Sequence, residues 1–151
     1  MSISPDSFQP SALFSVNAEG RNCCVILVVD DDEAMRSLLV DELSDYGCCV
    51  VEAADGEEAL SQIQDKAPSL VVTDLHMKFG GFDFIKNVKT AIPDCRVIVV
   101  TAFGDAQTHG IAKDLGVDGY FDKPVRMDDL KNLVTKICPI SHCPHIRMNL
   151  E

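Results

Sequence analysis

The sequence predicts an α/β fold in which one parallel β-sheet carries helices on both faces. Short, continuous apolar runs of the kind found in strands buried on both faces recur along the chain. Between these runs lie segments whose apolar residues follow helical spacing. Five such strand–helix pairs follow one another between residues 23 and 138. This alternation is typical of a single doubly wound domain.

The expected strands are four to six residues long and are separated by turn residues or helical segments. The first run ends in acid, at Asp30, and the third also ends in acid, at Asp74. The fourth is followed by Thr101, and the fifth leads into Lys123. In order, the expected strands are residues 24–29, 48–53, 70–73, 96–100 and 117–121.

Each expected helix has one apolar stripe, and most have a start or stop signal. Gly47 ends the first helix and Pro68 ends the second. Gly110 lies inside the fourth helix, where it lowers helix propensity. Asp128 and Asp129 occupy the first turn of the last helix, where the helix dipole favours negative charge. In order, the expected helices are residues 34–46, 55–67, 82–91, 105–115 and 127–137.

The composition bounds the class of protein. Hydrophobic residues make up 46% of the chain and charged residues 25%, which is typical of a globular protein. The net charge of −11 makes direct binding to nucleic-acid phosphates unfavourable. No apolar run is long enough to span a bilayer, and no signal peptide is recognisable. We therefore expect a cytoplasmic chain without membrane insertion, with tails over residues 1–22 and 139–151.

The seven cysteines do not suggest an extracellular disulfide framework, because their number is odd and no export signal precedes them. Most lie in or beside apolar runs, where we expect free thiols that pack as small hydrophobic groups. A metal- or redox-sensing module built on cysteine remains an alternative, although the spacing in the C-terminal segment matches no common zinc pattern. The cysteines of the apolar runs are Cys23, Cys24, Cys48, Cys49 and Cys95, and the C-terminal set is Cys138, His142, Cys143 and His145.

The polar residues at the strand ends are candidates for a functional site. In a parallel sheet, ligands bind beyond the carboxyl ends of the strands, so Asp30, Asp31, Asp74, Thr101 and Lys123 are expected at one edge. Carboxylates gathered there repel one another and favour a hard divalent cation such as Mg²⁺. A lysine and a hydroxyl beside that ion would suit a phosphoryl group, which an aspartate can accept as an acyl phosphate.

Each of these residues alone has a plainer explanation. Asp31 or Asp32 could do no more than cap the following helix, and Lys123-Pro124 could form an ordinary turn. The complete set, in this order and at the correct strand ends, favours a functional interpretation.

The same motifs resemble the receiver domain of two-component response regulators. The resemblance covers residues 23–138 and implies a flavodoxin-like (βα)₅ fold with strand order 2-1-3-4-5. The motifs that carry it are Val28-Val29-Asp30-Asp31, Val71-Val72-Thr73-Asp74, Val100-Thr101-Ala102, Lys123-Pro124 and the segment 51–60.

The resemblance implies a role for each site residue. Asp31 would bind Mg²⁺ (or Mn²⁺) directly and Asp30 mainly through water, and the backbone carbonyl of His76 would be a further ligand. Tyr120 would turn inward when Thr101 moves. The implied assignments are Asp74 as phosphoacceptor; Asp30, Asp31, Asp74 and His76 as metal ligands; and Thr101, Ala102, Lys123, Tyr120 and Pro124 as phosphoryl-binding and switch residues, with Pro124 after a cis peptide bond.

The loop after Asp74 departs from the family pattern. Lys78 stands where the family usually has proline, and the glycine at Gly80 arrives one residue early. We expect the loop 77–81 to be shortened and repositioned, with Lys78 pointing into solvent. His76 and Phe103 would flank the entrance to the site, and we expect Phe103 to slow attack by water.

The resemblance predicts a switch in which a histidine kinase or phosphotransfer protein phosphorylates Asp74 and a downstream protein or output domain responds. His109, Lys113, Tyr120 and Arg126 are candidates for the responding surface. A homodimer is possible, and the chain would be a stand-alone receiver or one excised from a longer regulator.

Two rival functions concern the site itself. One is a pseudo-receiver that acts as a constitutive protein-binding module. The other is a phosphatase with an aspartate nucleophile, which His76 disfavours because such enzymes often place a second aspartate at that position. We therefore expect no enzyme activity beyond self-catalysed phosphotransfer and autodephosphorylation.

Overall fold

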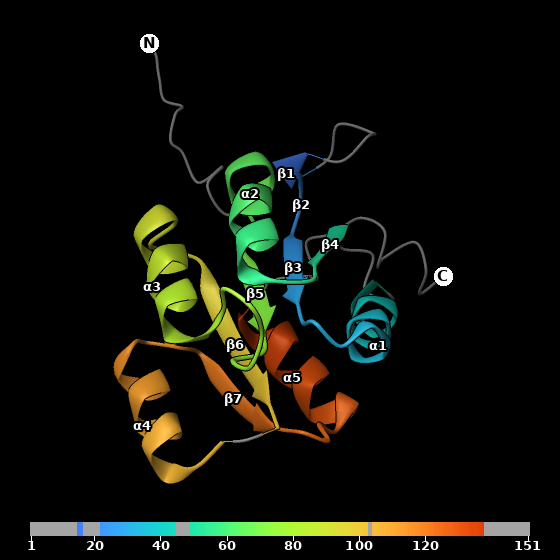
Figure 1. The fold of residues 1–151 in the computed structure, drawn as a ribbon. Helices are drawn as coiled ribbons and strands as arrows, with labels where there is room; N and C mark the ends of the chain where they lie inside the picture. The colour runs from blue at the N-terminus through green and yellow to red at the C-terminus, as the bar shows by residue number, and fades with distance from the viewer. Residues whose placement is uncertain (1–14, 17–21, 45–48, 103, 138–151) are drawn as a thin grey trace.

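The computed structural model describes residues 15–16, 22–44, 49–102 and 104–137. Five parallel strands form one sheet in the order β4-β3-β5-β6-β7, as expected for the order 2-1-3-4-5 (Figure 1). The strands are β3 (Val25–Val29), β4 (Cys49–Ala53), β5 (Leu70–Thr73), β6 (Arg96–Thr101) and β7 (Gly119–Asp122). The helices are α1 (Glu33–Ser44), α2 (Gly56–Lys66), α3 (Gly81–Ala91), α4 (Ala106–Asp114) and α5 (Met127–Ile137).

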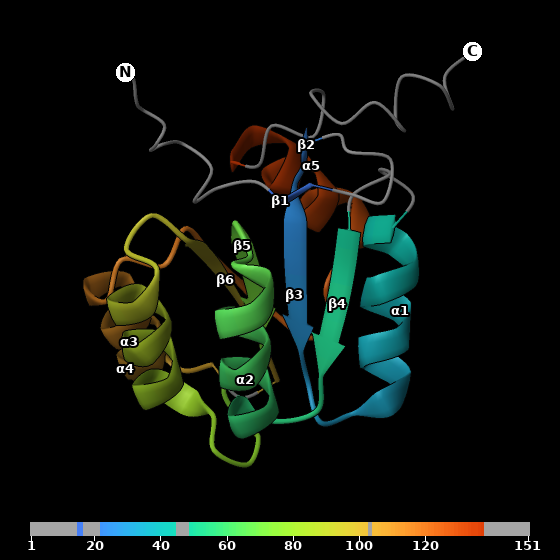
Figure 2. The same ribbon diagram turned by 90° about the horizontal axis from the view of Figure 1, so that it is seen from above.

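The sheet has an apolar layer on each face because successive side chains of its central strands point to opposite faces and pack against different helices. Ile26 and Val28 pack with α1 and α5, whereas Leu27 and Val29 pack with α2 and α3. Figure 2 shows α2 and α3 on one side of the sheet and α5 on the other. The central strands β3 and β5 are buried along their whole length, which explains their continuous apolar sequence.

Helix ends follow the local sequence. Asp55 caps α2 by accepting a hydrogen bond from the Glu58 backbone N–H at 2.8 Å, and the Glu58 carboxylate accepts one from the Ala54 N–H at 2.8 Å. These reciprocal bonds form a capping box. Asp105, which was expected inside the fourth helix, is instead its N-cap and accepts from the Thr108 N–H at 2.7 Å.

The last strand and the N-terminal segment depart most from the expectation. The last strand begins at Gly119, two residues late, because Asp118 bonds at both its backbone and its side chain to Val97 and so ends the preceding turn. An antiparallel pair, β1 (Ser15–Val16) with β2 (Asn22–Cys23), lies in the segment expected to be a tail. Tyr46, Gly47 and residues 139–151 lie outside the described part of the chain.

The cysteine expectation is correct at two positions and wrong at one. Cys95 is a buried free thiol and Cys49 a half-buried one, whereas Cys24 is disulfide-bonded. A sequence cannot reveal which sulfur atoms the fold brings within bonding distance. The proposed C-terminal metal ligands and Cys48 lie outside the described residues. None of the described helices is long and apolar enough to cross a membrane.

Candidate functional site

The backbone fixes the site residues at the carboxyl edge of the sheet. Asp30 and Asp74 follow β3 and β5 directly, Thr101 ends β6, and Lys123 follows β7. The backbone hydrogen bonds between neighbouring strands continue into these residues. The Asp74 N–H donates to the Val29 carbonyl at 3.0 Å, and the Lys123 N–H donates to the Thr101 carbonyl at 2.8 Å. The expected gathering at one edge is therefore present.

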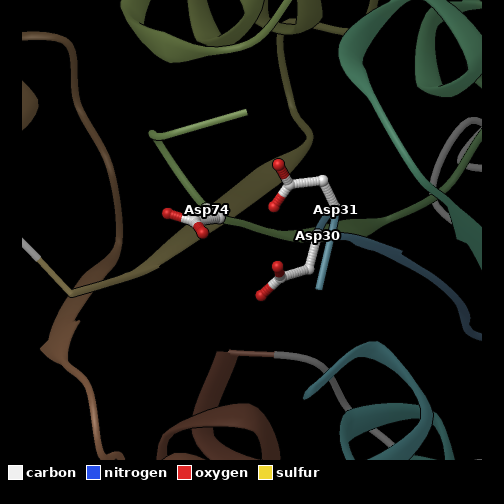
Figure 3. Close-up of side chains that lie close together, drawn as sticks. All are labelled: Asp30, Asp31 and Asp74. Atoms are coloured by element: carbon white, nitrogen blue, oxygen red, sulfur yellow. The ribbon is translucent and has the colours of Figure 1, made fainter. Parts of the chain in front are cut away.

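Three carboxylates form an acidic cluster at this edge. One oxygen from each of Asp30, Asp31 and Asp74 lies within 4.8 Å of the others. Figure 3 shows these three side chains close together. Asp30 and Asp74 are buried, with 1% and 6% of their surface exposed, while Asp31 is exposed. Buried carboxylates this close together need positive charge to offset their repulsion.

Lys123 supplies part of that charge. Its Nζ atom donates to Asp30 at 2.9 Å and to Asp74 at 3.1 Å. Burial alone would lower the pKa of Lys123, but the hydrogen bonds to the two carboxylates outweigh it and raise the pKa, so the ammonium stays charged. Burial raises the pKa of Asp30, although Lys123 opposes the shift. One ammonium faces three carboxylates, and this donor set fits a hard divalent cation.

Neighbouring groups hold the first acidic residues in place. The Asp32 N–H donates to Asp30 at 2.9 Å, and the Asp32 carboxylate caps α1 by accepting from the Ala34 N–H at 3.0 Å. Arg36 donates to the Asp30 backbone carbonyl at 2.8 Å and to the Glu52 carboxylate at 2.8 Å. The capping explanation therefore holds for Asp32, while Asp31 lies in the cluster. No local sequence pattern marks Arg36, because its contact with Glu52 on β4 depends on the tertiary fold.

Two buried hydroxyls belong to neighbouring strands, that of Thr101 at the end of β6 and that of Tyr120 on β7. Among the described residues, neither the Thr101 Oγ1 nor the Tyr120 hydroxyl has a hydrogen-bond partner. Burial, and after it the charges of Asp122 and Asp105, raise the pKa of Tyr120, so the phenol stays protonated. A buried polar group without a partner is costly and is often functional. The Lys123-Pro124 peptide bond is cis, as the resemblance implied, and Ala102 is exposed.

The unusual loop after Asp74 leaves the acidic cluster intact. The His76 backbone N–H donates to Asp74 at 3.1 Å, so both oxygens of that carboxylate have partners. The Lys78 carbonyl accepts a bond from the Gly56 N–H at 3.0 Å, which holds the loop against the start of α2. A side chain at Gly56 would collide with the Phe79 carbonyl. The altered loop can therefore lie this close to α2 only because position 56 is a glycine.

Lys78 is exposed as expected, and its ammonium lies 5.4 Å from the centre of the Phe79 ring. The following helix begins at Gly81, one residue before the expected start. The metal-binding role of the His76 carbonyl remains a prediction. Phe103 lies outside the described residues, so its expected effect on hydrolysis stays a prediction.

Comparison with known proteins defines the class. The family described as the response regulator receiver domain matches residues 26–135. The chain belongs to this family. It is 32% identical over 116 residues to sporulation initiation phosphotransferase F of Bacillus subtilis, with 76% of this chain and 94% of that protein covered.

Longer regulators and solved receiver structures give the same picture. The chain is 29% identical to a putative NtrX-like response regulator of Rickettsia conorii over 83% of its own length, but it spans only 27% of that protein. It also superposes on the receiver domain of NtrX from Brucella abortus with a TM-score of 0.69 and 30% identity, covering 74% of this chain and 96% of that one. A receiver protein from Pseudomonas putida gives a TM-score of 0.71 and 32% identity, with 76% and 97% covered.

Proposed function

We propose that this receiver domain accepts a phosphoryl group on Asp74 in the presence of Mg²⁺. The observation that carries the proposal is the convergence of Asp74, two further carboxylates and Lys123 at the edge of the sheet. Asp30, Asp31 and Asp74 would hold the ion, with His76 contributing its backbone carbonyl. Bound Mg²⁺ would offset the charge of the incoming phosphoryl group.

The residues of the chain have separate roles in the transfer. An Asp74 carboxylate oxygen forms the new bond to phosphorus while the donor's bond to phosphorus breaks, and the leaving group keeps the electron pair. Lys123, already bonded to Asp74, is placed to neutralise the phosphoryl oxygens. The Thr101 hydroxyl, without a partner among the described residues, is available to donate to the phosphorylated side chain.

We further propose that the donor is a histidine kinase or a phosphotransfer protein, and that phosphorylation changes binding to a downstream protein or output domain. Membership of the receiver family and the similarity to a phosphotransferase support this. Asp74 is then itself the substrate, and the chain turns over no external ester. A constitutive binding module is less well supported, because the acidic cluster and the Lys123 bridge are complete.

Intact mass after incubation with acetyl phosphate tests this proposal. We expect a gain of one phosphoryl group that requires Mg²⁺, disappears with EDTA and is absent from Asp74→Asn. Asp83→Asn, which alters an exposed acid in the first turn of α3, is the matched control and should still be phosphorylated. No gain in folded protein, or an undiminished gain in Asp74→Asn, would overturn it; the first result would favour the constitutive module.

A further inference from the structure

A groove lies between α2, α3 and the loop that leads into α3. The two helices lie side by side (Figure 2), and the groove has a volume of about 330 Å³. Its apolar part is made by Leu60 of α2, Phe84 of α3 and Phe79 of the loop. Phe84 is buried and Leu60 half-buried, whereas 58% of the Phe79 surface is exposed. The groove therefore contains an aromatic side chain that the fold covers only in part.

The backbone makes an exposed Phe79 unusual. Its φ angle is +57°, in the left-handed region that bulky residues rarely adopt. The Gly56 N–H bonds to the Lys78 carbonyl at 3.0 Å, and the Gly80 N–H bonds to the Met77 carbonyl at 3.1 Å, so the loop is held in this shape. Glycine would suit such a backbone better, and a largely exposed ring contributes less to folding than a buried one. Stability alone therefore does not account for a phenylalanine at this position.

The charged side chains that line the groove are both acidic. Glu57 lies in the first turn of α2 and Asp83 in the first turn of α3, and both are exposed. Within the described part of the chain, neither carboxylate has a hydrogen bond or an ion pair. Lys78 holds its ammonium near the Phe79 ring but does not line the groove. An apolar side chain next to a lysine or arginine would complement both the aromatic ring and the charge.

We propose that this groove is a docking site for a partner protein, whose bound segment carries an apolar side chain flanked by basic residues. The apolar side chain packs on Phe79 and Leu60, and the basic residues pair with Glu57 and Asp83. A second copy of this chain fits less well, because each copy brings the same acidic groove and a net charge of −11. None of the lining residues belongs to the acidic cluster around Asp74, so docking here does not depend on the proposed function.

A peptide titration followed by NMR tests the docking site in the full chain. The probe is a blocked six-residue peptide with two leucines between arginines, added at millimolar concentration to ¹⁵N-labelled protein. We expect it to shift the backbone amide signals of Leu60, Gly80 and Asp83, which sample both helices and the loop. Two control peptides, one with glutamates in place of the arginines and one with serines in place of the leucines, should leave these signals unchanged.

Phe79→Gly separates binding from folding. Glycine suits the left-handed backbone, so this variant should resist urea at least as well as the parent. Loss of the ring should nevertheless weaken peptide binding by about tenfold or more. Glu57→Gln should weaken binding by about 2- to 5-fold, and less at high salt. Leu38→Ser is the matched control, because it removes another exposed apolar side chain, on α1, and should bind the peptide as the parent does.

Several results would overturn the docking site. One is the absence of shifts at the groove in the parent, and another is equal binding of the arginine and glutamate peptides. Undiminished binding by folded Phe79→Gly would show that the ring is not the anchor. Sedimentation velocity supplies the last comparison: a dimer of the parent that is lost in Phe79→Gly would assign the groove to a second copy of the chain instead.

Discussion

The two edges of the sheet differ in how their carboxylates are paired with positive charge. At the carboxyl edge, the carboxylates of Asp30, Asp31 and Asp74 face one lysine. At the amino edge, Asp118 is paired with both Lys89 and Arg96. At the amino edge two cationic side chains serve one carboxylate, whereas at the carboxyl edge one lysine serves three carboxylates and leaves excess negative charge. This difference makes the carboxyl edge the better candidate for a cation site.

Hydrogen bonding shows the same contrast. The Asp118 carboxylate accepts from the Val97 N–H at 2.9 Å and from Arg96 at 3.2 Å, and Lys89 donates to the Cys95 carbonyl at 2.8 Å. At the carboxyl edge, the buried hydroxyl of Thr101 has no partner among the described residues. We infer that the amino edge stabilises the sheet. The carboxyl edge leaves polar groups unpaired at a cost in stability, as expected of a ligand-binding site.

The largest expected effect is on the rate of phosphorylation, and it distinguishes Lys123 at the carboxyl edge from Lys89 at the amino edge. Lys123→Ala should slow phosphorylation of Asp74 by acetyl phosphate by about 10²- to 10³-fold, because it removes a donor aimed at the transferred group. Lys89→Ala is the matched control at the amino edge and should leave the rate unchanged. Intact mass measured over time gives both rates. A similar loss in both variants would show that the effect comes from general destabilisation rather than from the site.

The next largest effect is on the free energy of unfolding, to which we expect the amino edge to contribute through Asp118. Asp118→Ala should lower the free energy of unfolding by about 1.5–3 kcal/mol, because it leaves the Val97 N–H without its charged acceptor. Phosphorylation of the folded variant should be retained. Asp65→Ala, which changes an exposed acid of α2, should alter stability by less than about 0.5 kcal/mol. Urea denaturation measures both, and equal values for the two variants would contradict the structural role of Asp118.

A smaller effect concerns pH at the amino edge. Burial raises the pKa of the Cys95 thiol from 9.0 to about 12. Between these values the folded protein keeps a proton that the unfolded chain loses, so stability falls as pH rises through this window. The contribution at pH 10 is about 1.4 kcal/mol.

Comparison with Cys95→Ala isolates this contribution from other groups that titrate at high pH. Urea denaturation at pH 7.5 and pH 10 should show a smaller loss of stability in Cys95→Ala than in the parent. An identical pH dependence in the two proteins would mean that the Cys95 thiol does not resist ionisation in the fold.

The sequence was sufficient to predict the fold and the gathering of the site residues. Continuous apolar runs such as the one around Val28 identify buried parallel strands, and parallel strands bring the residues after them to one edge. The strand order and the expected roles of Asp74 and Tyr120 came from the family resemblance, since periodicity does not determine them.

Contacts that depend on tertiary structure could not be predicted in this way. The bond from Arg36 to the Asp30 carbonyl, the stack of His109 on Tyr120 and the match between Gly56 and the altered loop each join segments that no local pattern connects. The late start of β7 at Gly119 has a similar origin, because the partner of Asp118 lies on β6.

The most direct test of the account is the effect of Mg²⁺ on unfolding. If the excess charge at the carboxyl edge is a cation site, Mg²⁺ at ten times its dissociation constant should raise the free energy of unfolding by about 1.4 kcal/mol. Asp31→Asn, which alters the exposed member of the cluster, should weaken this response, and Asp118→Asn should retain it. No response in the parent, or an undiminished response in Asp31→Asn, would contradict the central claim.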